Sequence, residues 1–260
     1  MSKFTYNNDL TAEQNTLCSK LCSLRMSKMA EELARQFQDP NEKLRTFDER
    51  VTDLINAERN FRDNKKFNSL IRQAHLKYSQ ADFDDSIYEP DRKLDFSTIE
   101  RLEDCAWIDE KHNLLITGPS GAGKTYLGCA FGVAACHQFH KVRYYPVNRI
   151  LVELKKAYAD GNDAYLAFTD QLTDYDLLII DDFGMMPIDL DDCCYLFQLL
   201  DMRDTVHSTM VMSQYPVKQW FDFFPRQAYA DSCLRRLTSG AYRIEMNGKD
   251  MSPSSISTAK

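Results

Sequence analysis

The sequence predicts an α/β protein with a central parallel sheet, preceded by an all-helical segment. From residue 114 to residue 245, short apolar runs alternate with helical patterns, as in successive β-α-β units. The first of these runs, 114–117, leads into a glycine-rich stretch at 118–125 that opens the next helical pattern. Before residue 80, apolar residues recur at three- and four-residue spacing, which predicts helices.

Helical patterns make up the first 80 residues. The first runs from about Thr11 to Gln38, and the residues Asp39-Pro40-Asn41 stop it. Thr46 and Glu49 then form a capping box, in which each satisfies a free N–H group at the start of a helix that reaches about Tyr78. We expect residues 1–80 to form a helical domain, followed by an acidic linker at 81–95.

The charge of this helical domain differs from that of the rest of the chain. The protein has a net charge of −7, but residues 1–80 hold 14 Lys and Arg against 11 Asp and Glu. Within 59–77 a single acid, Asp63, faces six cations: Arg59, Arg62, Lys65, Lys66, Arg72 and Lys77. This pattern fits a solvated charged face and a face that binds DNA or a partner equally well.

The α/β part is expected to occupy residues 96–250, with a flexible tail at 251–260. The run 177–180 is fully apolar, as a central parallel strand should be. Asn148 is suited to cap the helix that follows the second strand. The expected strands are 114–117, 142–146, 177–180, 209–212 and 242–245. The expected helices are 97–109, 126–139, 149–159, 163–172, 190–203 and 231–237.

The glycine-rich stretch matches the phosphate-binding loop over its full length, in its expected place between a strand and a helix. Its glycines allow the backbone to curl around a phosphate chain, and the following helix adds the positive end of its dipole. Lys124 is then placed to reach the β- and γ-phosphates, and the Thr125 hydroxyl to ligate Mg²⁺. ATP or GTP is the predicted ligand. The loop residues are Gly118, Pro119, Ser120, Gly121, Ala122, Gly123, Lys124 and Thr125.

A second nucleotide motif follows the apolar run at 177–180, where two acids end the strand. A carboxylate at this point of such a sheet holds the Mg²⁺ shell, and we assign that role to Asp181. Asp182 is then placed to orient or deprotonate the attacking water.

Two further polar groups are candidates for the reaction. Ser213-Gln214 ends the strand at 209–212, where a polar side chain can reach the γ-phosphate, although a surface turn explains it nearly as well. Arg235-Arg236 offers a cation for charge that develops in the transition state. An arginine pair of this kind is also common as a plain surface feature.

Composition excludes several classes of protein. No run approaches the roughly 18 apolar residues that a membrane span needs, and Met1–Leu10 lacks the apolar core of a secretory signal. The eight cysteines lie mostly in apolar or helical stretches, as expected of reduced thiols in the cytoplasm. The cluster from Cys136 to His140 lacks a second ligand pair and is more typical of a helix than of a zinc site.

The order of these motifs, and much of the sequence between them, resembles the IstB-like ATP-binding helper proteins of bacterial insertion sequences. These are relatives of the DnaC helicase loaders and belong to the AAA+ ATPases near the DnaA initiator. The resemblance covers about residues 17–250, and its most specific part is the Ser-Gln-x-Pro-Val-x-x-Trp stretch. The matching stretches are Leu24–Ala30, Phe47–Arg50, Trp107–Asp109, Asn113–Thr125, Leu177–Gly184, Ser213–Trp220, Ala230–Leu237 and Tyr242–Glu245.

This resemblance implies an AAA+ P-loop core with a five-stranded parallel sheet. It implies an ATPase that forms a homo-oligomer on double-stranded DNA when ATP is bound and presents that DNA to an IstA-like transposase. The implied ATP–Mg²⁺ ligands are Lys124, Thr125 and Asp181, with Asp182 handling the water, Ser213 as first sensor and Arg236 acting between subunits. DNA contacts are implied at Arg149, Lys155 and Lys156 of the insert after the second strand, and on the N-terminal helices, where Arg62, Lys65 and Lys66 are the candidates.

Three departures from the family pattern predict weaker DNA binding and slow hydrolysis. Residues 165–171 carry no cation where relatives carry arginines and a lysine, and phosphate contacts dominate DNA affinity. The stretch Asp250–Pro253 lacks the arginine of a second sensor. Asp182 stands where AAA+ proteins more often have a glutamate, so its carboxylate is one methylene short.

Alternatives to a transposition helper remain at this point. The nearest is a DnaC-like replicative helicase loader, which a pull-down of a helicase rather than a transposase would distinguish. A metabolic P-loop kinase would need a phosphoryl acceptor site and would have no use for Arg236 in a second subunit. A scaffold that binds ATP without turnover would keep its function as Lys124→Ala.

Overall fold

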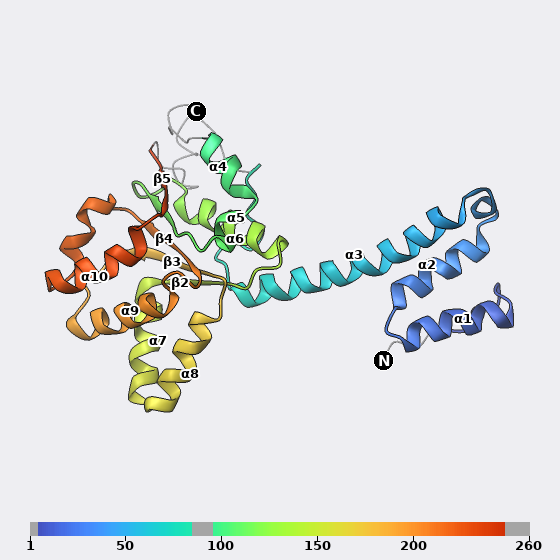
Figure 1. Cartoon of the computed structure of the whole chain (residues 1–260), viewed down its shortest axis with the longest axis horizontal. Coiled ribbons are helices and arrows are strands. Elements are labelled where there is room, and N and C mark those ends of the chain that lie inside the picture. The colour runs from blue at the N-terminus through green and yellow to red at the C-terminus, as the bar shows by residue number, and fades with distance from the viewer. Residues whose placement is uncertain (1–4, 85–95, 248–260) are drawn as a thin grey trace, which may run out of the picture. The chain divides into compact units, whose positions relative to one another are not determined.

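The computed structural model describes residues 5–84 and 96–247 (Figure 1). The chain divides into two compact units, residues 1–68 and 69–260, and each is described by itself. The helix α3 (Phe47–Ala74) is continuous through the boundary. The linker expected at 81–95 lies outside the described residues beyond residue 84, as do the tail expected at 251–260 and the stretch Asp250–Pro253.

The first unit consists of helices, as predicted. They are α1 (Ala12–Ser23), α2 (Ser27–Gln38), the 3-10 helix η1 (Pro40–Leu44) and the beginning of α3. The capping box at the start of α3 is confirmed: the Thr46 N–H donates to Glu49 Oε2 at 2.8 Å, and the Glu49 N–H donates to Thr46 Oγ1 at 3.3 Å. The buried apolar residues of this unit are Leu10, Cys18, Ala30 and Ala34.

The helical pattern from Thr11 to Gln38 forms two helices with a sharp break between them. Arg25 has a φ of 62°, and the Met26 N–H donates to the Leu21 carbonyl oxygen at 2.9 Å. This hydrogen bond closes the end of α1 with a left-handed residue, a position that glycine usually occupies. The sequence has an arginine there, so it gives no stop signal.

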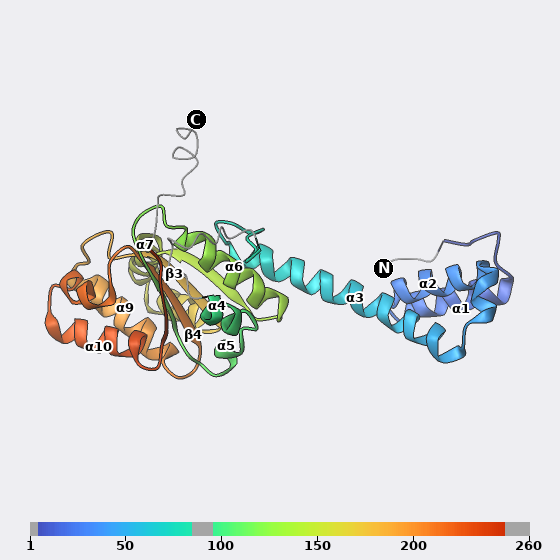
Figure 2. The same ribbon diagram turned by 90° about the horizontal axis from the view of Figure 1, so that it is seen from above.

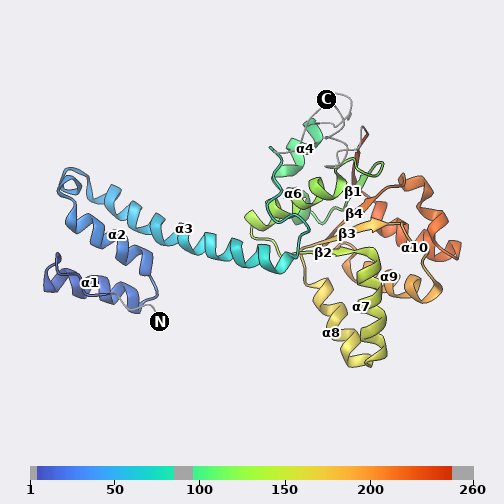
Figure 3. The same ribbon diagram turned by 180° about the vertical axis from the view of Figure 1, so that it is seen from behind.

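The second unit is built on a five-stranded, fully parallel sheet with the order β2-β3-β4-β1-β5. Figure 3 labels β2, β3, β4 and β1 in this order. This is the α/β architecture with a central parallel sheet that the sequence predicted. All five expected strands are present. They are β1 (Leu114–Thr117), β2 (Val142–Pro146), β3 (Leu177–Phe183), β4 (Ser208–Ser213) and β5 (Tyr242–Glu245).

Helices cover both faces of this sheet (Figure 2). On one face α6 (Lys124–His137) packs so closely that a Cβ at Gly128 would lie 2.3 Å from the Met212 sulfur. Side chains alternate between the two faces along each strand. Leu178, Ile180 and Val211 therefore point to the other face of the sheet, where they form a core with the helices there. Those helices are α7 (Val147–Ala159), α8 (Asn162–Thr173), α9 (Leu190–Arg203), η3 (Val217–Phe223) and α10 (Gln227–Thr238).

Two local predictions in this unit were wrong. The α7 helix begins at Val147 with Pro146 as its N-cap, so β2 runs directly into the helix. Asn148 therefore lies inside the first turn, where its side chain accepts only from the Arg149 N–H. The helix expected at 97–109 is two short helices, α4 (Phe96–Glu103) and α5 (Ala106–Asp109), because Cys105 takes a left-handed φ of 59°.

Within residues 5–84 and 96–247, no helix is both long enough and apolar enough to cross a membrane.

Candidate active site

The phosphate-loop segment lies between β1 and α6, as the sequence predicted. Gly123 precedes the first residue of α6 and has a φ of 87°, a conformation that favours glycine. Gly118 is restricted by contact, because a Cβ there would lie 2.3 Å from the Met246 carbonyl oxygen. The loop thus requires glycine at both ends. Its N–H groups stand at the amino end of α6, where a helix favours an anion.

Lys124 is the first residue of α6 and is only 8% exposed. Its Nζ donates to the Pro119 carbonyl oxygen at 2.8 Å, so the ammonium group lies across the loop. Burial lowers the pKa of Lys124, while the carboxylates of Asp181 and Asp182 act in the opposite direction. A cation held in this way is suited to phosphate, which supplies both acceptors and negative charge.

Asp181 is the centre of a buried hydrogen-bond network and is 1% exposed. The Thr125 hydroxyl donates to Asp181 Oδ2 at 2.8 Å, so the structure brings the loop and the second motif together. The Tyr144 hydroxyl donates to the same oxygen at 2.8 Å. The Asp182 N–H donates to the other carboxylate oxygen, also at 2.8 Å. The position of this carboxylate is therefore fixed from three sides.

Tyr144 was not among the residues that the sequence predicted for the site. It lies on β2, and the parallel register places Tyr144 beside Ile179 and Pro146 beside Asp181. Burial and the nearby Asp181 raise the pKa of the Tyr144 hydroxyl, so it stays protonated and keeps its donor role. A tyrosine two residues before the end of a strand would point to this contact only if β2 were known to pair with β3.

Asp182 lies at the sharp turn that follows Asp181. It has a φ of 58°, which is uncommon for a residue with a side chain, and Gly184 two residues later has a φ of 84°. The Asp182 side chain is exposed. Partial desolvation of its carboxyl group by the surrounding protein and the charge of Asp181 nevertheless raise the pKa of Asp182, while Lys77 and Lys124 act to lower it. A carboxylate with a raised pKa is a better proton acceptor once it is ionised.

Ser213 lies at the end of β4, next to β1 and β3. Its hydroxyl donates to the Phe183 carbonyl oxygen at 2.7 Å and accepts from the Tyr215 N–H at 3.1 Å. Its carbonyl oxygen accepts from the Gly118 N–H at 3.2 Å. Ser213 therefore connects the start of the phosphate loop with the turn after Asp182, and its hydroxyl is held by backbone groups.

Arg236 lies apart from these residues. Its guanidinium donates to Asp201 Oδ1, with the Nε contact at 2.9 Å, and lies over the Phe197 ring at 4.6 Å. The Arg236 carbonyl oxygen accepts from Asn113 Nδ2 at 2.8 Å. Asn113 immediately precedes β1, whereas the phosphate loop follows β1. Arg236 is therefore near the end of the sheet where the strands begin, whereas Lys124 is near the end where they finish.

The cations predicted for DNA on α7 differ in what they contact. Arg149 pairs with Glu153 at 2.8 Å. Lys155 pairs with Asp189 and Asp192 at 2.8 and 2.9 Å, and these contacts raise its pKa. Lys156 is exposed. Two of the three positive charges are therefore balanced by acids of the same unit.

The cations predicted for DNA on the N-terminal helices all lie on α3. Arg62 pairs with Glu58 at 2.8 Å and donates to the Arg25 carbonyl oxygen at 3.0 Å, so it ties α3 to the end of α1. Lys65 and Lys66 are exposed. Arg62 is exposed as well, so all three stay candidates for a contact with phosphate.

The donor set beside the loop fits Mg²⁺, which prefers oxygen ligands and is bound by few protein groups together with phosphate oxygens. Thr125 and Asp181 supply a hydroxyl and a carboxylate that already share a hydrogen bond. Among the described residues, no group of three or more His, Cys, Asp or Glu side chains is arranged to hold a metal on its own. Since Mg²⁺ is usually held by one or two carboxylates together with substrate phosphates, Thr125 and Asp181 would hold it together with the nucleotide.

A phosphate loop after β1 and an acid at the end of β3, on a parallel sheet of this strand order, define a P-loop NTPase of the AAA+ class. Comparison of the whole chain with known families identifies one family within this class. Residues 19–258 match the model of the IstB-like ATP binding protein family, and the chain belongs to that family.

Curated relatives come from insertion sequences. A protein of insertion sequence IS1162 from Pseudomonas fluorescens, named for ATP binding, is 37% identical over 78% of this chain and 87% of its own length. The insertion-sequence protein y4uH of Sinorhizobium fredii, also named for ATP binding, is 35% identical over 76% of this chain and 79% of its own.

Solved structures support the fold assignment. DnaI superposes with a TM-score of 0.55 at 18% identity, over 69% of this chain and 93% of its own. The DnaC helicase loader gives 0.51 at 17% identity, over 58% and 86%. AMPPCP-bound DnaA from Aquifex aeolicus gives 0.53 at 15% identity, over 66% and 51%. At these identities the likeness shows the fold alone.

Proposed function

We propose that this chain binds ATP with Mg²⁺ and hydrolyses the ATP slowly. The main support is the hydrogen bond from Thr125 to Asp181 beside the buried Lys124, because it joins the two motifs that a P-loop NTPase needs. Mg²⁺, when bound, neutralises charge on the phosphates. Lys124 binds the phosphates, Thr125 and Asp181 hold the metal, Ser213 positions the loop relative to β3, and Asp182 orients the water and accepts its proton.

The cellular role that we propose is that of a transposition helper. In this role the protein assembles as a homo-oligomer on double-stranded DNA when ATP is bound and recruits an IstA-like transposase. Membership of the IstB-like family and the insertion-sequence relatives support this role. The location of Arg236 supports the oligomer. This cation lies at the end of its own sheet away from the phosphate loop, so it would serve the nucleotide of a neighbouring subunit.

We propose a division of labour along the chain. Residues 1–80 contact DNA or the transposase, with Arg62, Lys65 and Lys66 as the candidate contacts, and residues 96–250 form the ATPase. On α7, Lys156 is the main candidate for a DNA contact, with Arg149 and Lys155 contributing only if their ion pairs open. None of the eight cysteines is in a disulfide, which supports the reducing cytoplasm as the site of action.

DNA co-sedimentation combined with size analysis tests this function. The purified full-length protein is compared with ATP, with ADP and without nucleotide, beside Lys124→Ala. Large protein–DNA assemblies that appear only with ATP, and are absent in Lys124→Ala, support the proposal. A monomer that ignores DNA under all three conditions refutes it.

A DnaC-like helicase loader is the alternative, and the fold shared with the DnaC helicase loader favours it. Both roles need ATP binding, so the assembly assay does not separate them. A pull-down with purified replicative helicase and with purified transposase does: retention of the helicase alone would replace the transposition role with the loader role.

A further inference from the structure

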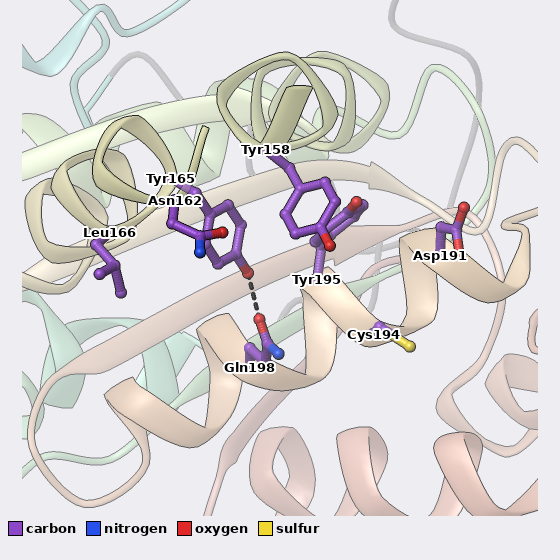
Figure 4. A pocket seen from close by; sticks show the side chains of 8 residues that line it. All are labelled: Tyr158, Asn162, Tyr165, Leu166, Asp191, Cys194, Tyr195 and Gln198. Carbon is purple, nitrogen blue, oxygen red and sulfur yellow. Dashed lines mark hydrogen bonds between the residues drawn. The ribbon is translucent and has the colours of Figure 1, made fainter. Parts of the chain in front are cut away.

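The helices α7, α8 and α9 enclose a pocket of about 530 Å³ that the nucleotide site does not use. Each helix contributes one tyrosine to it: Tyr158 from α7, Tyr165 from α8 and Tyr195 from α9 (Figure 4). Asp191 and Gln198, both on α9, also line it. Its volume is within the range of sites that bind small ligands or single side chains.

The three tyrosines form a contiguous aromatic wall. The ring centroids of Tyr158 and Tyr165 are 5.7 Å apart, those of Tyr158 and Tyr195 5.6 Å, and those of Tyr165 and Tyr195 5.7 Å. The Tyr165 hydroxyl is held by Gln198 Oε1 (Figure 4). The wall is open to solvent, because Tyr158 is 55% exposed. The three rings therefore hold one another in place, while the rest of the unit leaves them partly exposed to solvent.

The residues that line the pocket include one acid, Asp191, and neither lysine nor arginine. From Ala157 to Met202 the chain contains eleven aspartates and neither lysine nor arginine. Lys155, which precedes this stretch on α7, is already paired with Asp189 and Asp192. Asp191 lies one helical turn from Tyr195, and together with burial it raises the pKa of that tyrosine. A lining with a carboxylate and no cation of its own favours a cationic ligand.

We propose that this tyrosine pocket receives an arginine side chain from a basic segment of a partner protein. A planar guanidinium stacks on aromatic faces more readily than an ammonium group does, and its several donors suit a site with a carboxylate and an amide at the rim. The Tyr158, Tyr165 and Tyr195 rings supply the faces, and Asp191 and Gln198 supply the acceptors. None of the residues that line the pocket belongs to the nucleotide site, so the test needs no ATP.

Peptide binding to the full-length protein tests this proposal. The probe is a fluorescein-labelled eight-residue Gly/Ser peptide with two arginines, and its control carries citrulline, the neutral isostere, at both positions. Cation–π attraction of about 0.5–2 kcal/mol predicts that citrulline weakens binding by about 2- to 30-fold. Equal anisotropy titrations for the two peptides would overturn the proposal.

Variants locate the binding. Tyr195→Leu removes a ring and should weaken the arginine peptide, whereas Tyr195→Phe keeps the ring and should bind within about two-fold of the original. Tyr158→Leu repeats the test at a side chain exposed enough to leave the fold intact. Asp191→Asn should weaken binding, while Asp170→Asn, which removes the same charge from α8 outside the pocket, should not.

Two outcomes would refute the proposal. If Tyr195→Leu and Tyr158→Leu bind the arginine peptide as well as the unaltered protein does, the site lies elsewhere on the acidic surface. If sedimentation without peptide shows a self-association that both substitutions abolish, the occupant is a second copy of this chain rather than a partner protein.

Discussion

Arg236 and Asp201 form one ion pair, and their two alanine variants separate a structural from a catalytic role. Both Arg236→Ala and Asp201→Ala break the contact between α10 and α9. Only Arg236→Ala removes a cation that a neighbouring subunit could use. We therefore expect the two variants to have similar stability and very different ATPase activity in the assembled state.

The exposed fractions of the two side chains set the expected loss of stability. The Asp201 side chain is 52% exposed and that of Arg236 is 23% exposed, so breaking the pair should lower the free energy of unfolding by about 1 kcal/mol or less. Loss of the cation–π contact with Phe197 adds about 0.5–1 kcal/mol for Arg236→Ala alone. By contrast, an arginine that stabilises phosphoryl-transfer charge contributes about 10³-fold or more in rate.

The assay measures ATP hydrolysis with saturating DNA, together with urea unfolding of each variant. Arg236→Ala should lose hydrolysis almost completely, while Asp201→Ala should keep it or exceed the original rate because its arginine is released. Equal losses of hydrolysis in the two variants would refute the trans role and make Arg236 a structural residue.

Three further predictions concern the chain in isolation or its pH response. Tyr144→Phe leaves the buried Asp181 with one donor fewer and should lower the free energy of unfolding by about 1–3 kcal/mol in urea titrations; an unchanged midpoint would contradict this. Arg203→Met leaves the Leu172, Tyr175 and Ser208 carbonyl oxygens without this donor and should destabilise by about 1–3 kcal/mol for each one left unsatisfied, measured in the same way against Arg243→Met at an exposed position as a control. Because the pKa of Asp182 is raised, its proton-accepting form grows with rising pH, so hydrolysis should increase through a pKa above the usual value for aspartate. Asp182→Asn should have no such limb in its pH–rate profile, and an identical profile in both proteins would exclude Asp182 as the base.

The motifs of the site could be predicted because they are local in the sequence. The loop at 118–125 and the acids after the apolar run at 177–180 are each recognisable in a single short segment, and the parallel sheet then brings the ends of their strands together. The helix at 190–203 and the strand at 242–245 also have the predicted bounds. Clear periodicity and local motifs are therefore enough to predict the nucleotide-binding motifs and the bounds of these elements.

Contacts that depend on strand order could not be predicted. Tyr144 reaches Asp181 only because β2 pairs with β3, and no pattern within either strand indicates that pairing. Arg203 lies in the last turn of a predicted helix, where an arginine is ordinarily solvated, but here it is 1% exposed. Left-handed residues without glycine, such as Arg25 and Cys105, break helices without a compositional signal.

The turn at Asp182 has a consequence for how the sequence can drift. Left-handed backbone costs most side chains about 1–2 kcal/mol and aspartate less, and glycine at the φ of 58° of this position would carry no such cost. A lineage that had abandoned ATP turnover would therefore gain stability by losing this aspartate, and little would oppose the change. Comparing this position among many members of the family would thus show which property is under selection. An acid retained there indicates selection for hydrolysis, and glycine indicates selection for nucleotide binding alone.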